Sequence, residues 1–100
     1  MSVLIEKKEE NMIAYLAGDI DHHNARKIRE QVDFNAQSMS PSLLILDFKD
    51  VAFMDSSGIG LVMGRYKLMQ SLGGELKITN ASSHIKKVMK LAGLDKLSTV

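Results

Sequence analysis

A strand-length apolar run, Leu43–Phe48, leads through a short polar segment into a pattern of helical spacing. The polar segment, Phe53–Gly60, reads Phe-Met-Asp-Ser-Ser-Gly-Ile-Gly. Two hydroxyl groups, an acid and two glycines therefore stand where a strand is expected to pass into a helix. A nearly continuous apolar run is typical of a strand that is covered on both faces, so it is expected to form a central strand of a sheet.

Ser56 and Ser57 fall at the start of the expected helix. Backbone N–H groups at a helix start are unpaired and carry partial positive charge. A serine there can cap the helix, or its hydroxyl group can accept a phosphate in a place that tolerates an anion. The first role is structural and the second is a switch, and these residues alone leave both open.

The composition excludes several classes of protein. One hundred residues make one domain, 1–100, and a net charge of +1 gives no electrostatic case for binding nucleic acid or an anionic membrane. The absence of cysteine excludes disulfides, thiol catalysis and thiolate metal sites. Residues 1–8 become charged too early for a signal peptide, and no apolar run approaches the ~20 residues of a membrane span. A cytoplasmic protein with neither nucleic acid nor membrane as a partner is expected.

Hydrophobic periodicity predicts the remaining elements. Asp21 can cap a helix with apolar residues at spacings of three and four, and Ser40-Pro41-Ser42 would end it. Residues 97–100 are a candidate start of a last strand. The other expected elements are strands at 3–5, 12–16 and 75–79 and helices over 21–39, 56–72 and 82–93. Strands that alternate with helices after an initial hairpin predict an α/β fold with a mixed sheet.

The expected helix over 56–72 is apolar on two sides. A helix of this kind is either buried on both sides or has one side on a partner. We expect the side that carries Leu61 to be exposed in the free domain and covered by a partner. Gly60, Gly64 and Arg65 lie beside that side, where the glycines would allow a close approach. One stripe holds Ile59, Val62, Met63, Tyr66 and Met69, and the other holds Leu61, Leu68 and Leu72.

Three groups of residues have the residue types of a metal site, a hydrolase triad or a phosphate-binding loop, but none of them has the spacing that such a site requires. His22 and His23 stand beside two aspartates, but adjacent histidine side chains diverge and the pattern is not that of a metal site. Asp55, Ser57 and His84 lack the Gly-x-Ser-x-Gly elbow of a hydrolase. The Gly-Ile-Gly of the polar segment is not followed by the Gly-Lys-Ser/Thr of a phosphate-binding loop. The residues therefore predict a small non-enzymatic domain without a metal or a cofactor.

The stretch Asp55–Gly60, with Phe-Met before it, resembles the phosphorylation motif of the anti-sigma factor antagonists, single-domain proteins of the STAS class. Leu16–His23 is similar to the Gly-Glu-Leu-Asp-His-His segment of that family, although Asp19 stands where the family often has glutamate. Further matches in the expected order are Gly64–Lys67, Gly73–Glu75 and Ala92–Leu94. The likeness covers most of the chain and is closest to the sporulation sigma-F antagonists rather than to the general-stress branch.

The resemblance implies a STAS-type α/β domain with a mixed, mostly parallel sheet of four to five strands and three or more helices. Relatives of this family continue past the position of Val100 through a further strand and helix, so the last sheet edge is expected to differ here. The domain is expected to be a monomer when free.

The resemblance also implies a partner-switching mechanism. An anti-sigma factor, itself a Ser/Thr kinase, holds a sigma factor inactive, and the unphosphorylated antagonist binds that kinase and releases the sigma factor. The kinase phosphorylates the second serine of the pair, here Ser57, which ends binding, and a PP2C-type phosphatase reverses the modification. The residues expected at the partner-binding surface are Asp21, His22, Asp55, Ser56, Ser57, Gly58, Ile59, Gly60, Leu61 and Arg65, of which Leu61 and Arg65 are expected there from the apolar pattern of the helix.

Two interpretations from other classes stay open. In the first, the domain is a nucleotide-responsive STAS module that binds GTP or ATP with Asp21, Ser56 and Ser57. In the second, Ser57 is the nucleophile of an enzyme. A measurable nucleotide affinity without a kinase would favour the first, and burst release from an activated ester would favour the second.

Overall fold

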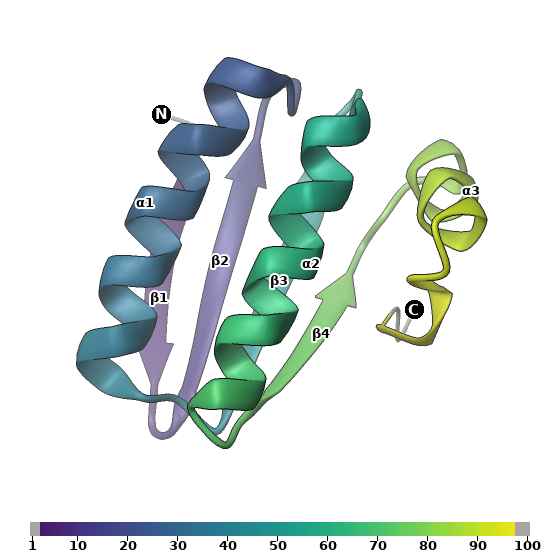
Figure 1. Cartoon of the computed structure of the whole chain (residues 1–100). Coiled ribbons are helices and arrows are strands. Elements are labelled where there is room, and N and C mark those ends of the chain that lie inside the picture. Colours follow the sequence, from purple (N-terminus) through teal and green to yellow (C-terminus); the bar gives the residue numbers. More distant parts are fainter. Residues whose placement is uncertain (1–2, 98–100) are drawn as a thin grey trace.

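The computed structural model describes residues 3–97 as a four-stranded sheet with helices packed mainly against one face (Figure 1). The elements are β1 (Val3–Lys8), β2 (Asn11–Ala17), α1 (His22–Met39), β3 (Leu43–Asp50), α2 (Ser56–Ser71), β4 (Glu75–Thr79), α3 (Ser83–Leu91) and the 3-10 helix η1 (Asp95–Leu97). Every strand and helix expected before residue 97 is present, with limits that differ by a few residues. Leu97 belongs to η1, and the rest of the expected last strand lies outside the described residues.

The sheet has the strand order β1-β2-β3-β4. β1 and β2 form an antiparallel hairpin, whereas β2, β3 and β4 run parallel to one another. Parallel neighbours need a crossover connection, and α1 and α2 supply the two crossovers. The predicted α/β fold with a mixed, mostly parallel sheet is confirmed. As a consequence, the carboxyl ends of β2 and β3 and the starts of α1 and α2 lie along the same edge of the sheet.

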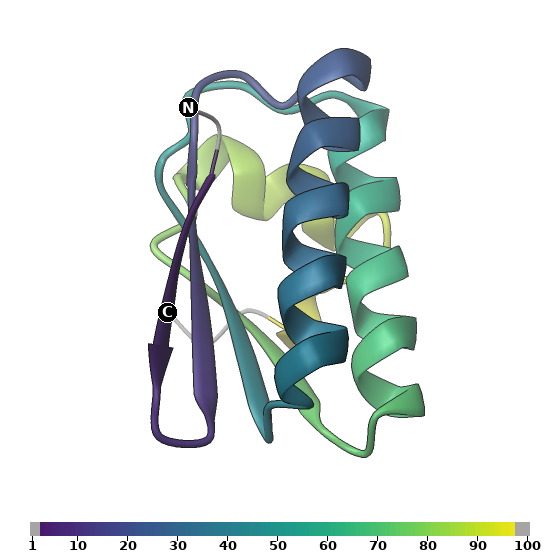
Figure 2. The same cartoon turned by 90° about the vertical axis from the view of Figure 1, so that its left-hand side faces the viewer.

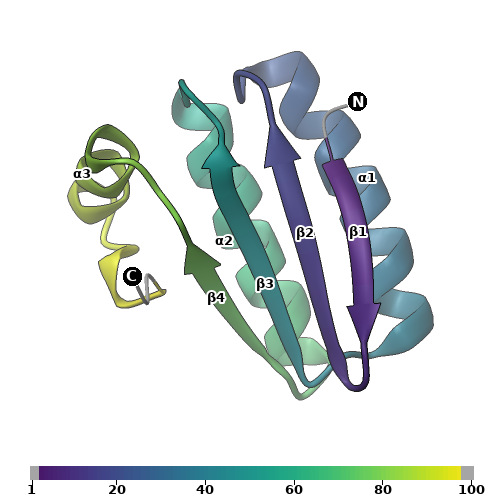
Figure 3. The same cartoon turned by 180° about the vertical axis from the view of Figure 1, so that it is seen from behind.

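α1 and α2 lie side by side on one face of the sheet, and α3 lies beyond the edge strand β4 (Figures 2 and 3). Alternate residues of β2 and β3 form the core beneath the two helices. These core residues are Met12, Ala14, Leu16, Leu44, Leu46 and Phe48. The intervening Leu43 and Ile45 are only half-buried, because no element of the described chain crosses the opposite face (Figure 3). For residues 3–97, the expectation that β3 is covered on both faces is therefore wrong.

α1 has the limits and the apolar stripe that the sequence predicts. Its end at Ser40 has a positive φ of 47°, and the Ser40 N–H donates to the carbonyl group of Ala36 (2.7 Å). Pro41 follows, and proline disfavours a helical conformation in the residue before it, so the helix stops here. The buried residues of the stripe are Ala25, Ile28, Val32 and Ala36.

α2 does not have one apolar side in the core and another free. Its buried face carries Gly58, Leu61, Val62, Arg65 and Met69. Leu61 is only 3% exposed and Arg65 only 5%, so the expectation that this side is free in the domain is wrong. The exposed apolar side chains of α2 are instead Met63 and Tyr66. The apolar pattern assigned the faces of α2 incorrectly, because a charged residue such as Arg65 is normally expected on an exposed face.

Candidate functional site

The loops that follow β2 and β3 are joined to each other at the carboxyl edge of the sheet. The Gly18 N–H donates to the carbonyl group of Asp50 (3.1 Å), and the Ile20 N–H donates to that of Phe53 (2.8 Å). The Asp55 N–H donates back to the carbonyl group of Ile20 (3.2 Å). Since α1 and α2 begin directly after these loops, the three hydrogen bonds hold the two helix starts next to each other.

An aspartate caps each of the two helices. The Asp21 Oδ1 atom accepts from the N–H of Asn24 (2.8 Å) at the start of α1. The Asp55 Oδ1 atom accepts from the N–H of Ser57 (2.7 Å) at the start of α2. The predicted cap at Asp21 is confirmed, whereas a serine cap of α2 is wrong. A carboxylate caps as well as a serine does, and its charge is favoured at the positive end of a helix.

Ser57 keeps its hydroxyl group free as a result. The residue is half-buried, and within residues 3–97 its hydroxyl group makes no hydrogen bond. The next residue, Gly58, is buried, and a Cβ atom on it would collide with Cγ and Sδ of Met54. This close approach holds the first turn of α2, and Ser57 with it, against the buried Met54.

A groove, which we call the α1–α2 groove, runs between the N-terminal halves of the two helices with a volume of about 530 Å³. Its α2 side includes Ser57, Gly60 and Gly64. A Cβ atom at either glycine would meet no atom within 4 Å, so these glycines leave the groove open and are not required for a close helix contact. The α1 side is lined by His22, Ala25, Arg26 and Arg29.

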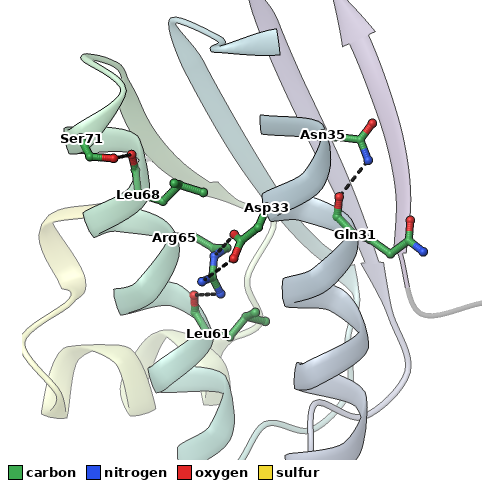
Figure 4. A network of polar contacts seen from close by, with 7 residues as sticks. All are labelled: Gln31, Asp33, Asn35, Leu61, Arg65, Leu68 and Ser71. Carbon is green, nitrogen blue, oxygen red and sulfur yellow. Dashed lines mark hydrogen bonds and ion pairs between the residues drawn. The ribbon is translucent and has the colours of Figure 1, made fainter. Parts of the chain in front are cut away.

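An ion pair joins α1 to α2 at the groove (Figure 4). The Arg65 Nε atom lies 2.7 Å from Oδ1 of Asp33, and Nη2 donates to Oδ2 of the same carboxylate (3.2 Å). Nη1 donates to the carbonyl group of Leu61 (3.2 Å). Burial lowers the pKa of Arg65 and raises the pKa of Asp33. The charge of each partner acts against these shifts and offsets them only in part. The pair fixes the register of one helix against the other.

The residues expected at the partner surface differ widely in exposure. Those exposed are Asp21, His22, Ser56 and Gly60; those half-buried are Asp55, Ser57 and Ile59; those buried are Gly58, Leu61 and Arg65. The exposed and half-buried residues gather around the starts of α1 and α2. Leu61 is instead part of the core, and Arg65 is buried in its ion pair with Asp33. Neither side chain is exposed to a partner in the free domain.

Three residues near the site were not assigned a role from the sequence. Phe53 is 47% exposed directly before the start of α2. Arg26 and Arg29 line the α1–α2 groove. The signal for the arginines was present, because His22, Arg26 and Arg29 have spacings of four and three and therefore share one face of a helix.

Little in the described residues points to metal or hydrolase chemistry. Within 3–97, no three His, Cys, Asp or Glu side chains lie close enough together to hold a metal ion. His84 is exposed on α3 and makes no hydrogen bond with Ser57. The site instead offers a free hydroxyl group beside two helix N-termini and two arginines, an environment suited to carrying an anion.

In the same part of the chain, no helix is both long enough and apolar enough to cross a membrane.

The model of the STAS domain family matches residues 2–100. The chain belongs to the STAS domain family. It is 34% identical to the anti-sigma F factor antagonist of Paenibacillus polymyxa over 89% of this chain and 76% of that protein. It is 31% identical to the anti-sigma-B factor antagonist of Bacillus subtilis over 94% of this chain and 84% of that protein. Within the STAS family, the chain therefore belongs with the anti-sigma factor antagonists, which are regulatory proteins and not enzymes.

Solved structures of the same type share the fold of this STAS domain. The unphosphorylated form of the anti-sigma factor antagonist SpoIIAA superimposes with a TM-score of 0.87 at 30% identity, over 97% of this chain and 85% of that one. The phosphorylated form of the Bacillus cell fate determinant SpoIIAA gives a TM-score of 0.79 at 30% identity, over 97% of this chain and 88% of that one.

Proposed function

We propose that this STAS domain is an anti-anti-sigma factor that is switched by phosphorylation of Ser57. The unphosphorylated form binds an anti-sigma factor kinase in the cytoplasm and releases the sigma factor. Relatives named as antagonists of anti-sigma factors support the partner, and a relative solved in a phosphorylated form supports the modification. Control of a sigma-F factor is the finer proposal, because the Paenibacillus relative is named an anti-sigma F factor antagonist.

The free hydroxyl group of Ser57 is the observation that carries the proposal. The kinase transfers the γ-phosphoryl group of ATP to the Oγ atom: the new O–P bond forms, the bond to the ADP oxygen breaks, and the hydroxyl proton is released. Because Asp55 supplies the helix cap, this step breaks no hydrogen bond of the described chain. A PP2C-type phosphatase restores the hydroxyl group by hydrolysis. The fold is therefore compatible with both states.

Phosphorylation ends binding through charge. The modification adds about 1.5 to 2 negative charges beside Asp55, which already carries one. An interface that covers Ser57 must then desolvate this charge, which costs several kcal/mol unless the partner neutralises it. Each ~1.4 kcal/mol lowers the affinity tenfold, so a local modification suffices to release the partner.

The test uses the cognate anti-sigma kinase with ATP and intact-mass measurement. The native chain and Ser56→Ala should each gain one phosphoryl group, whereas Ser57→Ala should gain none. Native protein and Ser57→Ala should bind the kinase, and the phosphorylated protein should not. Gain of mass by Ser57→Ala, or equal affinity of both forms for the kinase, would contradict the proposal. The nucleotide-binding interpretation stays a prediction, which calorimetric titration of the chain alone with GTP and ATP would decide.

A further inference from the structure

The α1–α2 groove places two arginines of one helix opposite the serine of the other. Arg26 and Arg29 on α1 and Ser57 on α2 line the same cavity of about 530 Å³. We propose that this groove is a binding site for the phosphate of phosphorylated Ser57, with Arg26 and Arg29 as its ligands. The inference rests on the proposed function, since it concerns the modified state of the same serine, but it assigns a role to residues outside the recognised motif.

The register of the helices brings Arg26 level with Ser57. α1 and α2 run in the same direction side by side (Figures 1 and 2), and the ion pair of Asp33 with Arg65 fixes which turns face each other. Two turns of helix take about seven residues. Two turns toward the N-termini from that ion pair therefore reach Arg26 on α1 and Gly58, the residue after Ser57, on α2. Arg29 lies about one turn closer to Asp33.

The two arginines are available for a new ligand. Arg26 Nε lies 3.5 Å from Oε1 of Glu30, and both side chains are mostly exposed, at 73% and 62%. Exposed pairs of this kind contribute little to stability. Arg29 has no ion pair with any residue in 3–97, although its charge works against the rise in the pKa of Asp33. A phosphate offers more charge than a carboxylate and three acceptor oxygens, which match the planar donor fork of arginine.

Two carboxylates near Ser57 act against a phosphate there, so the two arginines have to overcome their charge. Asp55 and Asp21 keep their negative charge while each accepts a hydrogen bond from its own helix. Asp33 is engaged with Arg65. His22 is the first residue of α1 and lines the same groove. The two helix N-termini add partial positive charge at the same end of the groove.

Occupation of the groove gives phosphorylation a second effect. The phosphate of Ser57 would bridge α2 to Arg26 and Arg29 on α1 and so fill the space that Gly60 and Gly64 leave open. The modified domain then presents a closed, ion-paired surface where the unmodified domain presents a groove.

The experiment introduces phosphoserine at position 57 during translation, so that no kinase is needed. The second ionisation of the phosphate, with a pKa of about 6 for a free phosphoserine, is followed by 31P NMR as a function of pH. Opposite charges lower the pKa of an acid, so this pKa should be about one unit lower in the native sequence than in Arg26→Gln/Arg29→Gln. The difference should shrink at about 1 M salt, because the site is open to solvent.

Lys27→Gln is the matched control, because it removes one positive charge from the same helix but lines a different cavity. It should leave the phosphate pKa at the native value. Arg26→Lys/Arg29→Lys should keep most of the shift, since the charges remain. An unchanged pKa in the double glutamine variant, or an equal change in Lys27→Gln, would overturn the site.

Thermal unfolding of the unphosphorylated variants guards against a folding artefact. Arg26 and Arg29 are exposed, so the double glutamine variant should unfold at the native temperature. The two proposals also fail separately. A domain that no anti-sigma kinase phosphorylates loses the proposed function while the NMR result stands, and an unaltered phosphate pKa removes the groove site while the switch stands.

Discussion

Ser57 stands in the first turn of α2, yet the hydrogen bond that such a position invites is made by Asp55. The serine is thus free to change its chemistry without a loss of helix stability. About two turns further along α2, Arg65 is buried, and its charge is balanced by the carboxylate of Asp33 on α1. The start of α2 therefore carries a free hydroxyl group that can be modified, and its middle carries the ion pair that joins α2 to α1.

Ser57→Ala should leave the free energy of unfolding within about 0.5 kcal/mol of the native value, because no hydrogen bond of the hydroxyl group is lost. Ser82→Ala is the matched control. The Ser82 hydroxyl accepts from the N–H of Ile85 (3.2 Å) and caps α3, so the same substitution there should cost about 1 kcal/mol. Urea unfolding of both variants measures the difference. An equal loss at position 57 would mean that the Ser57 hydroxyl caps α2 after all.

Asp33→Ala should destabilise the domain by about 3 kcal/mol, because it leaves the Arg65 charge buried without a partner. Combining it with Arg65→Met should recover most of that loss, since the buried charge is then gone. Arg65→Met alone leaves a carboxylate whose pKa is already raised by burial. Chemical unfolding of the three variants measures these differences, and a double variant no more stable than Asp33→Ala would contradict the assignment.

The same pair predicts a pH dependence with a definite sign. In Arg65→Met, the folded pKa of Asp33 lies still further above its unfolded value of about 4. The folded state then binds more protons than the unfolded state between these two pKa values, so stability rises as the pH falls through the folded pKa. The deficit of Arg65→Met relative to native protein should shrink on acidification from neutral pH, whereas that of Asp33→Ala should not.

The glycines of α2 have two different roles, one in close packing and the other in keeping the α1–α2 groove open. Gly58 must lack a side chain to lie against Met54, whereas Gly60 and Gly64 face open space. Glycine within a helix lowers stability relative to alanine. The open glycines thus weaken the helix and keep the α1–α2 groove wide.

Gly60→Ala should stabilise the domain by about 0.5–1 kcal/mol, because the new Cβ atom meets nothing and helix propensity improves. Gly58→Ala should destabilise it by about 1–3 kcal/mol, since the first turn would be overpacked against Met54. Thermal and chemical unfolding of the two variants decide the matter. If the groove is part of the partner surface, Gly60→Ala should also bind the anti-sigma factor more weakly despite its greater stability.

Leu61→Ala should cost about 2–5 kcal/mol of stability, because the side chain is buried between α2 and the rest of the core. Met63→Ala, two residues further on at an exposed position of 42%, should stay within about 0.5 kcal/mol. Denaturant midpoints of the two variants test the corrected orientation of α2. A small loss in Leu61→Ala and a large one in Met63→Ala would restore the orientation that periodicity suggested.

In the whole molecule, the sheet is a rigid frame, and the candidate site around Ser57 lies at the carboxyl ends of β2 and β3. The switch proposed for Ser57 requires no rearrangement of that frame, since the modified group lies outside every hydrogen bond of the sheet. Introducing phosphoserine at position 57 should therefore shift backbone NMR signals in the loops after β2 and β3 and in the first turns of α1 and α2. Signals of the β1–β2 hairpin and of α3 should stay in place, and shifts spread over the entire sheet would instead indicate a global change.

The succession of strands and helices follows from local patterns along the chain. The stops at Ser40-Pro41 and Gly73-Gly74 and the cap at Asp21 rest on interactions within a few residues along the chain, and the stripe of α1 is visible as the spacing of its apolar residues. The motif that contains Ser57 was also legible, together with the family that the comparisons confirm.

Which faces of the sheet and helices are covered depends on contacts between segments that are distant along the chain. Leu43 and Ile45 are as apolar as core residues, but whether a helix lies over them depends on the side of the sheet to which both crossovers pack. Arg65 is buried because Asp33, 32 positions away, supplies the opposite charge. The α1–α2 groove likewise exists only once two helices, separated by a strand, are brought side by side. Burial and charge pairing depend on such distant neighbours, whose positions no local pattern contains.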